Sequence, residues 1–210
     1  MSGMTRLFWI AAALCLLASC GQEAEKEGFS EGSIVLALGD SLTAGAGVTS
    51  QQAWPALLAE RTGWAVINGG VSGDKSDDAL KRLPALLKAH DPVLVLVTLG
   101  GNDMLRHIPE QETVDNLGEV LELVQAYGAE AVLLATPKPN LVRAAFQNLL
   151  TPEFYQLVAD RYQVHLIESA VAEVISNPEL KGDLLHPNVE GHVLLSAIIF
   201  SDLKKQGYAR

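Results

Sequence analysis

Short apolar segments alternate with amphipathic segments along this chain, and most of the apolar segments end at glycine. The two clearest are Ile34–Leu38, followed by Gly39, and Val93–Leu99, followed by Gly100. Runs of this length and composition predict strands that are buried on both faces. Strands that alternate with helices predict a parallel sheet covered by helices on each side. We therefore expect an α/β fold with one doubly wound domain.

The same patterns predict the individual elements. Strands are expected at 34–38, 64–68, 93–99, 131–135 and 164–167, and helices at 53–61, 77–90, 111–127, 152–162 and 188–204. Ser76 or Asp77 is expected to cap the second helix. In a doubly wound sheet, binding sites form beyond the carboxyl ends of the strands. The residues that follow each strand are therefore the candidates for chemistry.

Composition limits the class of protein. The chain has 210 residues, of which 49% are hydrophobic and 19% charged. This is enough apolar material for one folded domain, and it excludes a wholly disordered chain. The formal net charge is −10, which argues against nucleic-acid binding because that requires clustered positive charge. We expect no nucleic-acid partner.

The first 19 residues predict a signal peptide. Arg6 precedes the apolar run Leu7–Ala18, which is too short for an ordinary transmembrane helix. The sequence Leu17-Ala18-Ser19-Cys20 resembles the lipobox of bacterial lipoproteins, in which the cysteine is acylated. We expect a lipidated Cys20, a flexible tether over 20–30 and a folded domain over 31–210. The alternative is an ordinary secretory signal with an incidental cysteine.

The resemblance implies a lipid-anchored protein of the bacterial cell envelope. Gly21 is not the aspartate that often retains such lipoproteins at the inner membrane, so the outer membrane is expected where the source has one. Cys15 leaves with the signal peptide, and the folded domain then contains no cysteine. This excludes thiol catalysis and a cysteine-ligated metal in that domain.

Four polar clusters lie where strands end or the last helix begins. They are Gly39-Asp40-Ser41-Leu42, Ser72-Gly73-Asp74, Gly100-Gly101-Asn102-Asp103 and Asp183-Leu184-Leu185-His186. Acyl transfer requires a nucleophile, a base, an acid that orients the base, and donors for an oxyanion. The four clusters contain residue types suited to each of these tasks.

Each task has one candidate. Ser41 is the candidate nucleophile, because it lies at a strand-to-helix turn. His186 is the candidate base, and Asp183 precedes it by three residues, a spacing that lets the carboxylate reach the imidazole. The expected oxyanion hole consists of the N–H groups of Ser41 and Gly73 and the side-chain amide of Asn102.

In order and spacing, the clusters resemble the blocks of the SGNH hydrolases, the GDSL-type esterases and lipases. The strings Ala53–Leu58 and Arg82–Lys88 resemble the bacterial branch with thioesterase I, lysophospholipase L1 and arylesterase. The resemblance implies a flavodoxin-like, three-layer α/β/α sandwich with a five-stranded parallel sheet. It also implies hydrolysis through an acyl-enzyme without metal or organic cofactor, with the family's catalytic roles on Ser41, Gly73, Asn102, Asp183 and His186.

The chain departs from that branch at Lys75, at Met104 and at the pair Arg106-His107. These positions lie beside the acyl pocket in the family, so they put the substrate in doubt and not the chemistry. We expect the pocket to be lined by Leu42, Met104, Leu105 and the loop 137–141.

Other polar residues have a structural interpretation. Asp40 is expected to organise its turn by hydrogen bonds and not to act in catalysis, and Asp74 and Asp103 likewise. The remaining histidines have no acid at a matching spacing, and we expect them at the surface or at helix ends: His90, His107, His165 and His192. For His192, a supporting role beside His186 is the alternative.

The leading functional hypothesis is a serine esterase that acts on carboxylic, thio- or lysophospholipid esters. A cell-envelope polysaccharide O-acetylesterase is the alternative, with a shallower pocket. A surface lipoprotein that binds a partner without catalysis is a third. The partner expected is a small-molecule or lipid ester, and the chain is expected to be a monomer. The sequence does not distinguish esterase, thioesterase and deacetylase.

Overall fold

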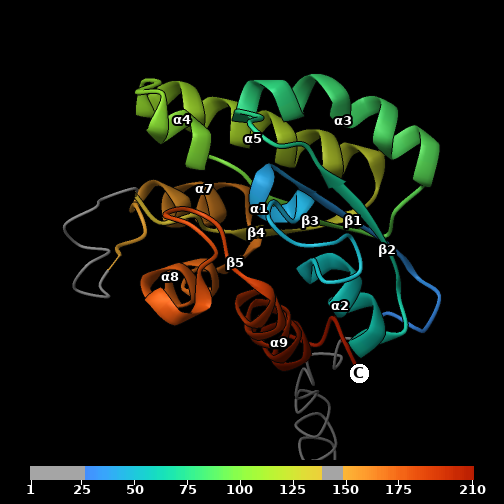
Figure 1. Cartoon of the computed structure of the whole chain (residues 1–210). Coiled ribbons are helices and arrows are strands. Elements are labelled where there is room, and N and C mark those ends of the chain that lie inside the picture. Colours follow the sequence, from blue (N-terminus) through green and yellow to red (C-terminus); the bar gives the residue numbers. More distant parts are fainter. Residues whose placement is uncertain (1–26, 139–148) are drawn as a thin grey trace, which may run out of the picture.

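Five parallel strands form one sheet in the order β2-β1-β3-β4-β5 (Figure 1). The computed structural model describes residues 27–138 and 149–210. The strands are β1 (Ile34–Gly39), β2 (Ala65–Gly70), β3 (Leu94–Thr98), β4 (Glu130–Leu134) and β5 (His165–Ile167). This is the strand order of flavodoxin-like domains, and it confirms the predicted α/β sandwich.

Helices cover both faces of the sheet (Figure 1). One layer contains α3 (Ser76–His90), α5 (Glu110–Tyr127) and α7 (Phe154–Tyr162). The other contains α2 (Trp54–Thr62), α8 (Ala170–Ser176) and α9 (Val189–Lys205). Two short helices, α1 (Ser41–Ala44) and α4 (Gly101–Leu105), follow directly after β1 and β3. A 3₁₀ turn, Pro178–Leu180, precedes the loop that carries His186.

Alternation along the strands produces two separate hydrophobic cores. In β1, Val35 and Ala37 face the core beneath α2, α8 and α9, whereas Leu36 and Leu38 face the core beneath α3, α5 and α7. All four side chains are fully buried. Burying a leucine fully is worth about 1.5–3 kcal/mol, so the two cores together fix the position of β1 between its neighbours.

Two local predictions need correction. The residue that caps α3 is Lys75, not Ser76 or Asp77. Ser76 is fully buried and donates hydrogen bonds to Asp103 from its backbone N–H and its hydroxyl. Helix α8 was not expected, because six of its seven residues are buried and the single exposed residue, Glu173, is too little to give a helical period.

The topology explains where a site can form. Strands β2 and β3 lie on opposite sides of β1, so the chain turns to different sides of the sheet after β1 and after β3. Ser41 follows β1, and Asn102 follows β3. The described chain begins beside its own C-terminus, where the Phe29 N–H donates to the Tyr208 carbonyl (2.8 Å). This contact lies before the start of β1, and Ser41 lies after its end.

The predictions for residues 1–26, including the signal peptide and the lipid on Cys20, lie outside the described residues. Within residues 27–138 and 149–210, no helix has the length and hydrophobicity needed to cross a bilayer.

Candidate active site

Ser41, His186 and Asp183 form one hydrogen-bonded chain. His186 Nδ1 lies 2.8 Å from Asp183 Oδ2, and His186 Nε2 lies 2.9 Å from Ser41 Oγ. An ionised carboxylate can only accept, so the ring hydrogen is on Nδ1 and Nε2 accepts from the serine hydroxyl. The structure therefore brings together, in a usable tautomer, the three residues that the sequence suggested for proton transfer.

A tight turn positions the acid and the base. Asp183 Oδ1 accepts the backbone N–H groups of Leu185 (2.7 Å) and His186 (2.8 Å). Burial alone would raise the pKa of Asp183, but hydrogen bonds from the His186 ring and from these two N–H groups outweigh it and lower the pKa to about 2. Asp183 is thus ionised at neutral pH.

Asp40 shapes the turn that carries Ser41. Its Oδ1 accepts the Leu42 N–H (2.9 Å), which caps α1. The carboxyl group is 2% exposed, and burial raises its pKa to about 6, although hydrogen bonds from Leu42 and Asn102 and the nearby His186 act in the opposite direction. A Cβ on Gly39 would lie 2.1 Å from the Thr43 hydroxyl, so only glycine fits before Asp40.

Gly73 presents its backbone toward the same site. Its φ of +88° lies in the left-handed region, which glycine adopts without strain. Among the residues that the structure describes, the N–H groups of Gly73 and Ser41 have no hydrogen-bond acceptor. Both residues line the cavity that contains the Ser41–His186 pair. They are placed to donate to an oxyanion there.

The side chain of Asn102 has more partners than the sequence suggested. Its Nδ2 donates to Asp40 Oδ2 (3.0 Å) and to the carbonyl of Asp74 (3.0 Å). Both amide hydrogens therefore have acceptors, and donation to an oxyanion requires that one of them is shared. Sequence spacing places Asn102 at the site but carries no signal for these two contacts.

The cavity beside Ser41 has a volume of about 380 Å³. Its apolar lining includes two of the predicted residues, Leu42 and Leu105, together with Ala46, Pro137, Ile175 and Leu185. Met104, also predicted, does not line it. The Met104 side chain instead lines a neighbouring depression with His107, Phe154 and Leu157, because successive residues of helix α4 point in different directions. From the predicted loop 137–141, Pro137 contributes, and residues 139–141 lie outside the described residues.

Two histidines differ from the expectation of surface or helix-end positions. His192 is fully buried in α9, and its Nδ1 accepts the N–H of Trp54 (3.3 Å) at the start of α2. Burial, with a smaller effect of His186, lowers the pKa of His192 to about 4. His165 contacts the carboxylate of Asp202, 37 residues further along the chain. Both pairs join distant segments, so no local spacing could have revealed them.

In the described ranges, no group of three or more histidine, cysteine or acidic side chains is arranged so that it could hold a metal ion.

A hydrogen-bonded Ser–His–Asp chain is the arrangement that serine hydrolases of several folds use for acyl transfer. Residues 37–194 match the GDSL-like lipase/acylhydrolase family. The chain belongs to this family, and it is an ester hydrolase.

Relatives support the same assignment. The chain is 33% identical over 208 residues to an arylesterase of Vibrio mimicus, covering 96% of this chain and 99% of the relative. It is 39% identical over 159 residues to thioesterase 1/protease 1/lysophospholipase L1 of Escherichia coli K12, covering 73% of this chain and 75% of the relative.

Solved structures agree with the fold. The crystal structure of TesA superimposes with a TM-score of 0.74 at 30% identity, covering 83% of this chain and 99% of TesA. The psychrotrophic esterase EstA from Pseudoalteromonas sp., inhibited by monoethylphosphonate, superimposes with a TM-score of 0.71 at 29% identity, covering 82% of this chain and 97% of EstA.

Proposed function

We propose that this protein is a serine esterase that cleaves acyl esters through a covalent intermediate on Ser41. The observation that carries the proposal is the continuous chain from Asp183 through His186 to Ser41, with both links at 2.8–2.9 Å. This chain opens into a cavity with an apolar lining, which suits an acyl group.

The first half of the reaction forms the acyl-enzyme. Ser41 Oγ attacks the carbonyl carbon of the ester while its proton moves to His186 Nε2. The negative charge on the carbonyl oxygen is stabilised by the N–H groups of Ser41 and Gly73 and by the Asn102 amide. The Asp183 carboxylate stabilises the imidazolium. His186 then returns the proton to the departing alcohol or thiol, and the acyl group remains on Ser41.

The second half releases the acid. His186 Nε2 takes a proton from water, whose oxygen attacks the acyl carbon. The tetrahedral intermediate collapses, the proton returns to Ser41 Oγ, and a carboxylic acid leaves. Besides the water molecule, each step uses only the residues named above.

Steady-state assays test the proposal. The domain from residue 27 onward is assayed on p-nitrophenyl esters from acetate to palmitate, with Ser41→Ala as the test variant and Ser50→Ala, an exposed serine, as its matched control. We expect Ser41→Ala to lose at least about 10³-fold in kcat and Ser50→Ala to equal the wild type. Equal activity of Ser41→Ala and the wild type would refute the proposal.

The size and lining of the cavity favour acyl chains over acetyl groups. A deacetylase of cell-envelope polysaccharides would need a shallow, open site for a sugar chain. The apolar side chains of Leu42, Leu105 and Ile175 around Ser41 instead support a substrate with an apolar acyl part. Retention of activity only on acetate in the ester series would favour the deacetylase.

We also propose that Cys20 carries a lipid that holds the protein at the bacterial cell envelope. The support is the lipobox-like sequence Leu17–Cys20 alone. Expression of the full chain with Cys20→Ser, followed by fractionation, tests it. We expect the variant in the soluble fraction and the wild type in the membrane fraction; membrane association of both would contradict the anchor.

A further inference from the structure

The three expected oxyanion donors come from three separate segments. Ser41 follows β1, Gly73 follows β2, and Asn102 lies in α4 after β3. Two polar contacts bind the third segment to the others, since Asn102 Nδ2 donates both to Asp40 of the first and to the Asp74 carbonyl of the second. The first and second segments are also joined, because the Val71 N–H donates to the Gly39 carbonyl (3.1 Å) and the Asn68 side-chain amide donates to the Thr43 carbonyl (2.9 Å). Neither of these two contacts reaches Asp74, the residue after Gly73.

Arg82 adds a link that does reach Asp74. Its Nε donates to Asp74 Oδ2 (2.7 Å), and its Nη2 donates to the carbonyl of Gly39 (2.9 Å). Gly39 precedes Ser41 by two residues, and Asp74 directly follows Gly73. The side chains of Arg82 and Asp74 are only 23% and 13% exposed, so water competes weakly for these contacts.

We propose that Arg82 is a positioning residue for ester hydrolysis, which holds the nucleophile turn and the Gly73 loop at a fixed separation. The proposal rests on the proposed function of the Ser41 site. Arg82 ties Asp74, directly after Gly73, to the carbonyl of Gly39 in the nucleophile turn. The planar guanidinium suits this role because it presents two N–H groups to two acceptors at a fixed angle.

The fold does not depend on this side chain. Helix α3 is held against the sheet and α5 by Ala79, Leu83 and Leu87, which are buried in the core. Arg106 also binds the Gly73 loop, through the Gly73 carbonyl (2.9 Å), but among the described residues this exposed side chain forms no hydrogen bond with the β1 turn. Loss of Arg82 therefore loosens the spacing between the Ser41 and Gly73 N–H groups and leaves the domain folded.

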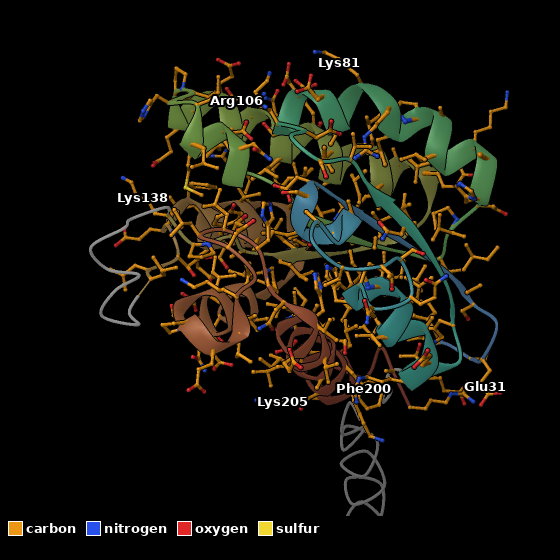
Figure 2. All side chains as sticks on the ribbon, viewed as in Figure 1. Glu31, Lys81, Arg106, Lys138, Phe200 and Lys205 are labelled. Carbon is orange, nitrogen blue, oxygen red and sulfur yellow. The ribbon has the colours of Figure 1, made fainter. Side chains whose placement is uncertain are left out.

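Arg82→Lys tests the geometry, because it keeps the charge but replaces the planar fork by a single ammonium. We expect kcat on p-nitrophenyl esters to fall about 10- to 100-fold with KM changed less than about threefold, as for a misplacement on the order of 1 Å. The matched control is Lys81→Gln, which removes a cation from the neighbouring position. Lys81 lies on the outer face of α3 and pairs with Asp77 (2.8 Å) (Figure 2).

Chemical rescue separates positioning from general stability. Addition of guanidinium ion at non-denaturing, millimolar concentration to Arg82→Ala is expected to raise kcat at least about threefold. Methylammonium at the same concentration, which has the charge without the planar fork, is expected to have no effect. Circular dichroism and titration of active sites with a phosphonate confirm how much of each variant is folded.

A wild-type kcat for Arg82→Lys would overturn the proposal. It would also be overturned if the loss of kcat in Arg82→Ala were explained wholly by a smaller folded fraction and were not rescued by guanidinium. Failure of the proposed function is a different result, in which the wild type is inactive or Ser41→Ala is fully active.

Discussion

Asp40 and Asn102 are joined by a hydrogen bond from Nδ2 to Oδ2 of 3.0 Å, although 62 residues separate them. The contact places a buried carboxylate directly behind a side chain that we expect to stabilise the oxyanion. Through this hydrogen bond, Asp40, which directly precedes the nucleophile, contacts helix α4, which follows β3.

This burial has a measurable effect on stability. The pKa of Asp40 is raised from 3.8 to about 6, chiefly by burial. Between these values the folded chain binds more protons than the unfolded chain, so the free energy of unfolding falls as pH rises through this window. In Asp40→Asn this decrease in the free energy of unfolding should be absent, because an amide does not titrate. The stability of the wild type relative to Asp40→Asn should decrease by up to about 3 kcal/mol between pH 4 and pH 7.

Urea denaturation at four pH values checks this prediction. Asp160→Asn is the control, because the Asp160 carboxylate is exposed and binds Gln156 on the surface of α7. A stability difference between wild type and Asp40→Asn that does not vary with pH would show that the buried carboxylate does not titrate in this range.

His192 is expected to act in the opposite direction. Its pKa is lowered from 6.5 to about 4, mainly by burial, so the unfolded chain binds more protons than the folded chain between these values. The stability that neutral His192 contributes is complete above about pH 6.5 and is lost as pH falls toward 4, by up to about 3 kcal/mol. His192→Asn keeps an acceptor for the Trp54 N–H and removes the titration.

The wild type should therefore lose stability relative to His192→Asn as pH falls from 7 to 4, which thermal unfolding can follow. His107→Asn is the control, because His107 is exposed and its φ of +57° is one that asparagine tolerates. Parallel pH curves for wild type and His192→Asn would contradict the assigned burial effect.

Asp183→Asn tests the orientation of the base. The amide oxygen is expected to replace Oδ1, which accepts two backbone N–H groups, so that the NH2 group faces His186 Nδ1 and donates to it. The ring hydrogen then lies on Nε2, which can no longer accept from Ser41. We expect kcat to fall about 10²- to 10⁴-fold, as for the equivalent change in other serine hydrolases, with little change in KM. Glu179→Gln, an exposed change nearby in the chain, is the control. A variant with more than half of wild-type kcat would remove Asp183 from the mechanism.

The acyl pocket is tested by two neighbouring residues. Leu105 lines the cavity beside Ser41, and Met104 lines the separate depression. Leu105→Ala is expected to lower the ratio of kcat/KM for octanoate to that for acetate by about tenfold, because a contact with the acyl chain is lost. Met104→Ala should leave the ratio unchanged. The reverse pattern would restore the original sequence-based assignment of Met104.

The sequence predicted the sheet well, because β1, β3 and β4 are short apolar runs that are almost wholly buried. The edge strands β2 and β5 are less buried. The sequence also placed the residues of the Ser41–His186–Asp183 chain, since a strand end and a three-residue spacing are local signals. It did not predict α8, in which six of the seven residues are buried, or the buried position of His192, which depends on packing between α2 and α9. The links from Arg82 to Gly39 and Asp74 were likewise not predicted, because separations of 43 and 8 residues match no local pattern.

Covalent labelling of Ser41 tests the central claim most directly. The protein is treated with an activated alkylphosphonate ester, which imitates the tetrahedral intermediate, and is then examined by intact and peptide mass spectrometry. We predict one phosphonyl group per chain, on Ser41, with loss of esterase activity in proportion to labelling and no label on Ser41→Ala. Full inactivation with the label on another residue, or full labelling of Ser41 with activity retained, would contradict the account.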